Sequence, residues 1–249
     1  MSIKLYKMLD ELLKTCYNVV TVKKKGAVKM SKSVYSLVLM DDVVEQIDRM
    51  AYAMNTSRSN LINQILAEKV AYVTPEKRMN SIFKSIEQLM DDDSFQIQEQ
   101  ASDAMMSIRS ALKYKYKPTI RYSLELHRNP QKTIGQLKVS FRTSSEQLKS
   151  DLTSFLKLWA TLENTYIIGY FPEGISYRIE NGRFIRTFRL PPEHEQSSTE
   201  EIGRAIGEYI RMFDDILKVY FANLDNEQEA AIKAKQAYEQ YLHKGIVLI

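Results

Sequence analysis

The hydrophobic pattern changes its period twice in the first third of the chain. Apolar residues recur every three or four positions over 3–16, which predicts a helix. Over 33–40 the period falls to two residues, which predicts a strand. One face of this strand carries Tyr35, Leu37 and Leu39, and the other carries Val34, Ser36 and Val38. The lysine-rich run between helix and strand has no period and predicts a flexible basic arm.

Two short helices are predicted directly after this strand. The acidic pair 41–42 can cap a helix whose apolar stripe ends at Met54. Asn55 then tolerates the left-handed backbone that commonly ends helices. The pair 56–57 can cap a second helix, with an apolar stripe that ends at Val70.

The next segment predicts two further helices. Pro75 suits the first position of a helix. A second apolar stripe at helical spacing runs from Ile97 to Leu112, and the acidic run 91–93 separates the two helices. Together they form a helical connector over 73–116.

After Pro118 the pattern becomes typical of an antiparallel sheet. Residues 119–128 and 133–143 alternate, and two further alternating runs flank Asn181-Gly182, a strong hairpin signal. Ser144 with Gln147 predicts a capped helix between these strand pairs.

Ser198 with Glu201 predicts the cap of one long helix that continues to about residue 243. The order of strands and helices predicts the α+β class. The chain is thereby divided into an N-terminal helix with a basic arm (1–29), a strand–helix–helix unit (30–72), the connector (73–116) and an α+β domain ending in a long helix (117–249).

Composition narrows the class of protein. The 249 residues are 44% hydrophobic and 27% charged, which is typical of a globular chain. The single Cys16 excludes a disulfide framework and a zinc site built from paired thiolates. No apolar run approaches the length of a membrane helix, and the charged residues within 1–13 do not suit a secretory signal. We therefore expect a cytoplasmic protein without membrane contact.

The net charge of +4 conceals an alternation along the chain. Residues 1–40 hold eight basic and two acidic residues, and 116–190 hold twelve and six. The blocks between and after them are acidic, with nine basic against twelve acidic residues over 41–115 and six against eleven over 191–249. Either the basic blocks form surfaces for a polyanion, or basic strands and acidic helices neutralise each other when packed.

A strand of eight residues followed by two short helices cannot bury its own apolar face. The simplest partner is a second copy, with the two strands paired about a two-fold axis. A two-stranded ribbon of that width fits the major groove of DNA.

The residues of this unit resemble the ribbon-helix-helix family of DNA-binding repressors over 30–72. The resemblance is carried by Lys32-Ser33-Val34-Tyr35-Ser36-Leu37-Val38-Leu39, by Asp41-Asp42 and by Asn55-Thr56-Ser57-Arg58-Ser59-Asn60-Leu61-Ile62. It implies that Val34, Ser36 and Val38 face base edges and that Tyr35, Leu37 and Leu39 form the dimer core. It also implies phosphate contacts from Thr56, Ser57 and Arg58 at a helix N-terminus, and from Lys29 and Lys32 on the arm.

The chain departs from the family where bases are read. Val34 and Val38 can make only apolar contacts, and Ser36 discriminates poorly between bases. Sequence specificity would then come from the lysine-rich arm, from DNA shape or from cooperative binding of several dimers. Alternatively, the ribbon serves dimerisation alone, Arg58 covers apolar surface with its stem, and the valines are buried by residues 1–20.

Nothing in the sequence indicates an enzyme, a cofactor or a metal site. The three histidines lie in separate elements, and no phosphate-binding loop, zinc-binding helix or nucleophile elbow occurs. A candidate second basic surface lies opposite the apolar positions of the predicted strands and comprises Arg121, His127, Lys138, Arg142 and Arg178. A sheet with one face in solvent would show the same pattern.

The sequence thus predicts a homodimeric or higher-order protein that binds double-stranded DNA, with a repressor as the leading hypothesis. A plasmid or phage accessory factor (partition, copy control, relaxosome) and a dimerising protein adaptor remain as alternatives. The C-terminal domain would serve oligomerisation, a protein partner or a small-molecule effector.

Overall fold

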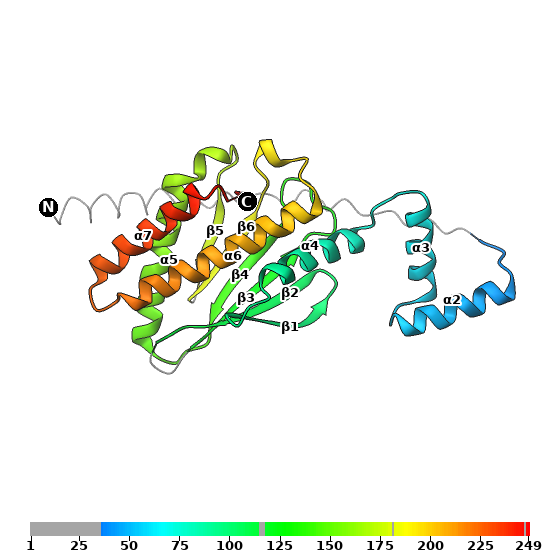
Figure 1. Cartoon of the computed structure of the whole chain (residues 1–249), viewed down its shortest axis with the longest axis horizontal. Helices are drawn as coiled ribbons and strands as arrows, with labels where there is room; N and C mark the ends of the chain where they lie inside the picture. The colour runs from blue at the N-terminus through cyan, green and yellow to red at the C-terminus, as the bar shows by residue number, and fades with distance from the viewer. Residues whose placement is uncertain (1–35, 115–117, 181, 247) are drawn as a thin grey trace. The chain divides into compact units, whose positions relative to one another are not determined.

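The computed structural model describes residues 36–114, 118–180, 182–246 and 248–249 (Figure 1). The chain divides into two compact units, 1–40 and 41–249, which are considered separately. The predicted N-terminal helix and basic arm lie outside the described residues. No helix in the described ranges is long and apolar enough to span a membrane.

Two short helices begin the second unit. They are α2 (Asp41–Ala53) and α3 (Arg58–Lys69). The acidic pair 41–42 lies in the first turn of α2, where negative charge is favoured. Ser57 caps α3, because its hydroxyl accepts a hydrogen bond from the N–H of Asn60. The two predicted helices and the turn between them are therefore confirmed, with bounds within a few residues of those expected.

The rest of the unit is built on one antiparallel sheet of six strands. The strands are β1 (Phe95–Ser102), β2 (Met105–Ala111), β3 (Thr119–Leu126), β4 (Gly135–Phe141), β5 (Ser176–Glu180) and β6 (Arg183–Phe188). Their order is β1-β2-β3-β4-β6-β5. A four-stranded meander is thus extended by the β5–β6 hairpin, which turns at the predicted Asn181-Gly182 with Gly182 at φ 70°. The α+β class is confirmed.

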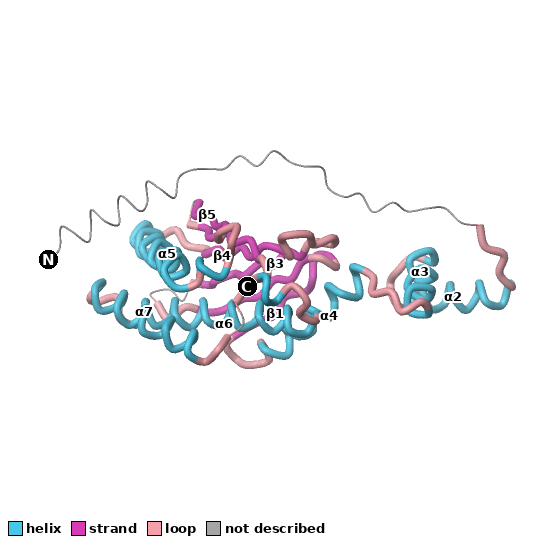
Figure 2. The backbone as a smooth tube through the Cα atoms, turned by 90° about the horizontal axis from the view of Figure 1, so that it is seen from above, coloured by secondary structure: helices cyan, strands magenta, loops and turns pink. Residues whose placement is uncertain are grey.

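Four helices pack against this sheet, and two 3₁₀ turns connect elements. They are α4 (Pro75–Leu89), α5 (Glu146–Tyr166), α6 (Thr199–Ala222), α7 (Glu227–His243), η1 (Ile168–Tyr170) and η2 (Pro192–His194). Figure 2 shows α4, α6 and α7 together on one side of the sheet. Along β3 the residues alternate between buried and exposed, so only this side is covered by helices.

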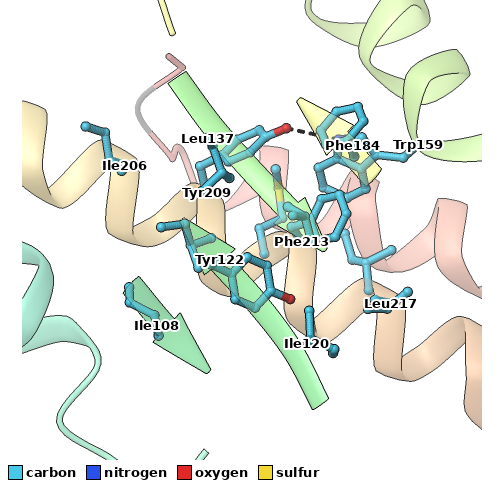
Figure 3. Close-up of a cluster of buried hydrophobic side chains, with 14 of the residues drawn as sticks. Ile108, Ile120, Tyr122, Leu137, Trp159, Phe184, Ile206, Tyr209, Phe213 and Leu217 are labelled. Atoms are coloured by element: carbon cyan, nitrogen blue, oxygen red, sulfur yellow. Dashed lines mark hydrogen bonds between the residues drawn. The ribbon is translucent and has the colours of Figure 1, made fainter. Parts of the chain in front are cut away.

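The core lies between the sheet and the helices and is rich in aromatic rings. Trp159 on α5 and Phe213 on α6 are fully buried with ring centroids 4.7 Å apart. Tyr209 lies beside them and accepts a hydrogen bond from the indole N–H of Trp159 at 3.0 Å (Figure 3). Edge-to-face contacts of this kind stabilise a core beyond the area they bury.

Glycines let α4 and α6 approach closely. A side chain at Gly203 would place its Cβ 2.7 Å from the backbone oxygen of Ile82, and one at Gly207 would meet Leu89 at the same distance. At Gly203 the backbone of α6 therefore lies directly against the backbone of α4, and at Gly207 it lies against the side chain of Leu89.

Two carboxylates are buried where α5 and α6 meet the sheet. Asp214 accepts hydrogen bonds from Tyr122 at 2.8 Å and from Ser110 at 3.1 Å, and it pairs with Lys218 at 2.5 Å. Burial raises the pKa of Asp214, and these three partners oppose the shift. The carboxylate is thus satisfied by β2, β3 and its own helix.

The second carboxylate, Glu163, pairs with Arg186 on β6 at 2.7 Å, and both side chains are fully buried. Tyr209 donates to the same carboxylate at 3.0 Å, and the guanidinium lies 4.7 Å from the Tyr209 ring centroid. Burial raises the pKa of Glu163, and the neighbouring guanidinium counters it. This pair joins α5 to β6, the strand next to the edge strand β5.

The prediction of a helix over 97–112 is wrong. These residues form the β1–β2 hairpin, in which Ile97 pairs with Ile108 and Ser102 with Met105. Apolar residues happen to recur there at helical spacing, but pairing of β2 with β3 along its whole length stabilises the extended form. The connector 73–116 is therefore not a separate element, because α4, β1 and β2 belong to the α+β body.

Two predictions about the remaining helices are corrected in detail. The cap of α5 is Ser145, whose hydroxyl accepts from the N–H of Leu148, and not Ser144. The long C-terminal helix is two helices, because the chain turns after Asn223 and Asn226 caps α7. The predicted capping box of Ser198 with Glu201 is confirmed.

Candidate nucleic-acid interface

A tight turn joins α2 to α3. Asn55 has φ 49°, the left-handed conformation that the sequence indicated. The N–H of Thr56 returns to the carbonyl of Ala51 at 2.9 Å, and the Thr56 hydroxyl accepts from the Asn60 side chain at 2.9 Å. These bonds fix the direction in which the first turn of α3 points.

That first turn presents groups that suit a phosphate. The first N–H groups of a helix have no partner within it, and the helix dipole adds positive potential there. Ser57 is exposed and uses its hydroxyl for Asn60, while Thr56 is half-buried. Arg58 begins the helix beside them.

In the free chain the Arg58 guanidinium is paired with Asp48 of α2. Its Nε donates to the carboxylate at 2.5 Å, and Nη2 donates to the other oxygen. Both side chains are about half exposed. Neither bond uses Nη1, so the guanidinium keeps N–H donors for a second anion while Asp48 fixes its orientation.

The helical pair buries very little of its own apolar surface. Its cluster of buried residues comprises Ile47, Ala51 and Leu61, with Ile62 packed against them. Of the eighteen exposed large hydrophobic residues among those described, thirteen fall within 37–73. Exposed apolar surface concentrated in this way is typical of surfaces that bind another molecule.

The predicted ribbon residues divide between described and undescribed parts of the chain. Lys29, Lys32, Val34 and Tyr35 lie outside the described residues. Residues 36–40 form no strand in the single chain. Leu37 and Leu39, expected in a dimer core, are 58% and 40% exposed, while Val38, expected to face DNA, is fully exposed.

The candidate second basic surface is brought together in part. Arg121, Lys138 and Arg178 lie on the face of the sheet opposite the helices. His127 and Arg142 lie just beyond their strands, and the His127 ring is hydrogen-bonded to Thr133 at 3.0 Å.

Arg109 and Arg183 join this face and were not predicted. Arg109 pairs directly with Arg121, and Arg183 pairs with Ser140. Because residues 97–112 are predicted as a helix, the sequence does not place Arg109 on a strand. Arg183 follows Asn181-Gly182 in sequence, so the hairpin signal together with the two-residue period could have found it.

The described residues also include a surface pocket, which lies apart from the two buried carboxylates. A pocket of about 240 Å³ is lined in part by Tyr166, Glu193 and His194, and neither buried carboxylate lines it. Among the described residues, no three His, Cys, Asp or Glu side chains are placed to hold a metal ion.

Comparison with known proteins finds no matching family model, curated protein or solved structure.

Proposed function

We propose that the chain is a dimeric double-stranded-DNA-binding protein of the ribbon-helix-helix kind. Residues 33–39 of two copies would form the two-stranded ribbon that enters the major groove, and occupancy of its sites would repress transcription. The proposal is carried by the exposed apolar side chains within 37–73, and it is supported by the capped start of α3, which suits a phosphate.

The exposure of the alternating segment supports the proposed dimerisation. Leu37 and Leu39 share one face at a two-residue spacing, and each leaves a large fraction of its side chain in water. Pairing with the same segment of a second copy gives each backbone a hydrogen-bond partner and places four leucines in one core.

The start of α3 supports the proposed phosphate contact. Ser57 caps the helix, and the Asp48–Arg58 pair holds a guanidinium beside the first turn. In a ribbon dimer these two helix starts flank the ribbon, so they would hold the DNA backbone on either side of the groove.

Base readout by the ribbon is limited to short side chains. Ser36 can exchange a hydrogen bond with a base edge, and Val38 can contact a thymine methyl group. We therefore propose a modest preference for sequence, strengthened when several dimers bind adjacent sites.

A matched pair of variants tests the two roles. Arg58→Ala should weaken binding to every duplex by about the same factor and reduce the slope of log affinity against log salt by about two per dimer, because each copy loses one phosphate contact. Ser36→Ala should change the ranking of duplexes and leave the salt slope unaltered. Binding is measured by fluorescence anisotropy on a randomised duplex library and on its selected members.

The outcomes separate the hypotheses. Wild-type chain that binds no duplex at low salt would refute the proposal and leave a dimerising adaptor. If Arg58→Ala loses affinity for one duplex sequence only, Arg58 contacts bases and not phosphates. An unchanged ranking with Ser36→Ala would place readout outside the ribbon.

A further inference from the structure

The face of the sheet that points away from the helices carries one cation from each of five strands. These are Arg109 on β2, Arg121 on β3, Lys138 on β4, Arg178 on β5 and Arg183 on β6. Arg121, Arg178 and Arg183 are exposed, and the other two are half-buried. We call these five side chains the basic sheet face.

The strand register aligns three of these cations in a row. Arg109 is directly opposite Arg121, which is opposite Ser140, which is opposite Arg183. Neighbouring strands lie about 4.8 Å apart, so this row spans about 14 Å. Since one DNA strand carries a charge about every 3.4 Å along the axis, the row matches about four phosphates.

Most cations of the basic sheet face have no partner within the described chain. Arg109, Arg121, Lys138 and Arg183 form no ion pair or side-chain hydrogen bond with any described residue, and only Arg178 pairs with Glu180, at 3.7 Å. Some exposed cations elsewhere on the body are paired, as in Arg128–Glu76 and Lys132–Glu173, and others, such as Lys77, Lys84, Lys157 and Arg204, are not. What distinguishes the basic sheet face is that its four unpaired cations share one side of one sheet.

The arrangement opposes like charges across the sheet. Two arginines directly opposite each other on neighbouring strands destabilise the pairing. Among the described side chains of this face, the carboxylates are Glu125, which accepts a hydrogen bond from Gln136, and Glu180, which pairs with Arg178 and lies opposite Arg183. Neither lies between Arg109 and Arg121. An anion held between Arg109 and Arg121 would relieve the repulsion.

The chemistry of the face selects phosphates over bases. No described residue that points to this side of the strands is aromatic, so bases have nothing to stack on. Its other side chains include the hydroxyls of Ser107, Ser123 and Ser140, which can donate to phosphate oxygens. Positive charge with short hydroxyls and no rings is typical of contact with a DNA backbone, independent of sequence.

We propose that the basic sheet face is a second DNA-binding surface, which holds the phosphate backbone of duplex DNA. It is separate from the ribbon and shares no residue with it.

The test compares full-length variants of equal charge. The sheet variant carries Arg109→Gln, Arg121→Gln and Arg183→Gln. The control variant carries Lys149→Gln, Lys233→Gln and Lys235→Gln, which remove three exposed helix cations that already pair with carboxylates. Affinity for a random-sequence duplex is measured by anisotropy between 50 and 300 mM salt, and circular dichroism checks folding.

Losing three phosphate contacts per copy should lower the salt slope by about 2.7 per chain and weaken binding on the order of 100-fold near 0.15 M salt. The control variant should match the wild type. A third variant with lysine at positions 109, 121 and 183 should recover the slope, because it restores the charge.

A fourth variant, with Ser36→Glu and Val38→Glu, distinguishes the two proposals. It should lose its preference among duplexes. Its slope of log affinity against log salt should keep the contribution of the basic sheet face, which the sheet variant loses. If the sheet and control variants bind alike while the fourth variant loses all binding, the basic sheet face is refuted and the ribbon remains. If the fourth variant binds like the wild type and the sheet variant does not bind, the ribbon is refuted and the sheet remains. Absence of binding by the wild type refutes both.

Discussion

Replacing Leu37 with alanine should weaken the dimer about 100-fold. The change removes three carbons, worth about 2.4 kcal/mol when fully buried at 0.8 kcal/mol each. Leu37 is 58% exposed in the single chain, so about 1.4 kcal/mol per copy remains to be gained on pairing. The residue occurs twice in a two-fold dimer, which gives about 2.8 kcal/mol, or a factor of about 100 in the dissociation constant.

The assay is sedimentation equilibrium of the full chain across a range of concentrations. The matched control is Val38→Ala, because Val38 is fully exposed and belongs to the opposite face of the predicted strand. Dimer dissociation should be unaltered in the control and DNA affinity should fall in both variants. Equal effects of the two substitutions on the dimer would refute the assignment of faces, and a wild type that stays monomeric at all concentrations would refute the ribbon pairing.

Two further predictions concern the α+β body. Tyr122→Phe removes a donor to the buried carboxylate of Asp214 and should lower the free energy of unfolding by about 2 kcal/mol at neutral pH, as measured in urea. Because burial raises the pKa of Asp214, ionising this carboxyl group costs stability, which declines as the pH rises from about 4 through the raised pKa. The stability lost in Tyr122→Phe should therefore be smaller at low pH, where Asp214 is protonated. An equal loss of stability at low and at neutral pH would contradict this account. Gly203→Ala should cost about 1–3 kcal/mol despite the better helix propensity of alanine, because its Cβ would lie 2.7 Å from the Ile82 oxygen. Gly169→Ala, where a Cβ meets nothing within 4 Å, is the control, and equal stabilities of the two variants would show that α4 and α6 separate readily.

Sequence periodicity predicted local structure well where a cap or turn residue accompanied it. Caps and turn residues act on groups only three or four residues away, so the nearby sequence is enough to predict their effect. Examples are Asn55, Ser57 and the Ser198–Glu201 capping box. The hairpin at Asn181-Gly182 is of the same kind. The candidate DNA site of the ribbon rests on such local signals.

Periodicity failed where distant residues decide the outcome. Residues 97–112 can be placed on one face of a helix, but β2 pairs along its length with β3, and that pairing decides the strand. The break between α6 and α7 was also missed. The break falls in the polar run 225–229, which contains no proline or glycine that would signal the end of a helix. The return of α7 is favoured by burial of Tyr238 in the core.

The sequence alone determined the α+β class, the helical pair after the alternating segment and the concentration of positive charge in residues 116–190. It could not determine which cations of that block, and which from outside it, share a surface. The register of six strands placed Arg109 beside Arg121 and aligned both with Arg183, residues up to 74 positions apart. Charge composition is a property of the chain, whereas the field that a ligand meets depends on distances that only the paired strands define.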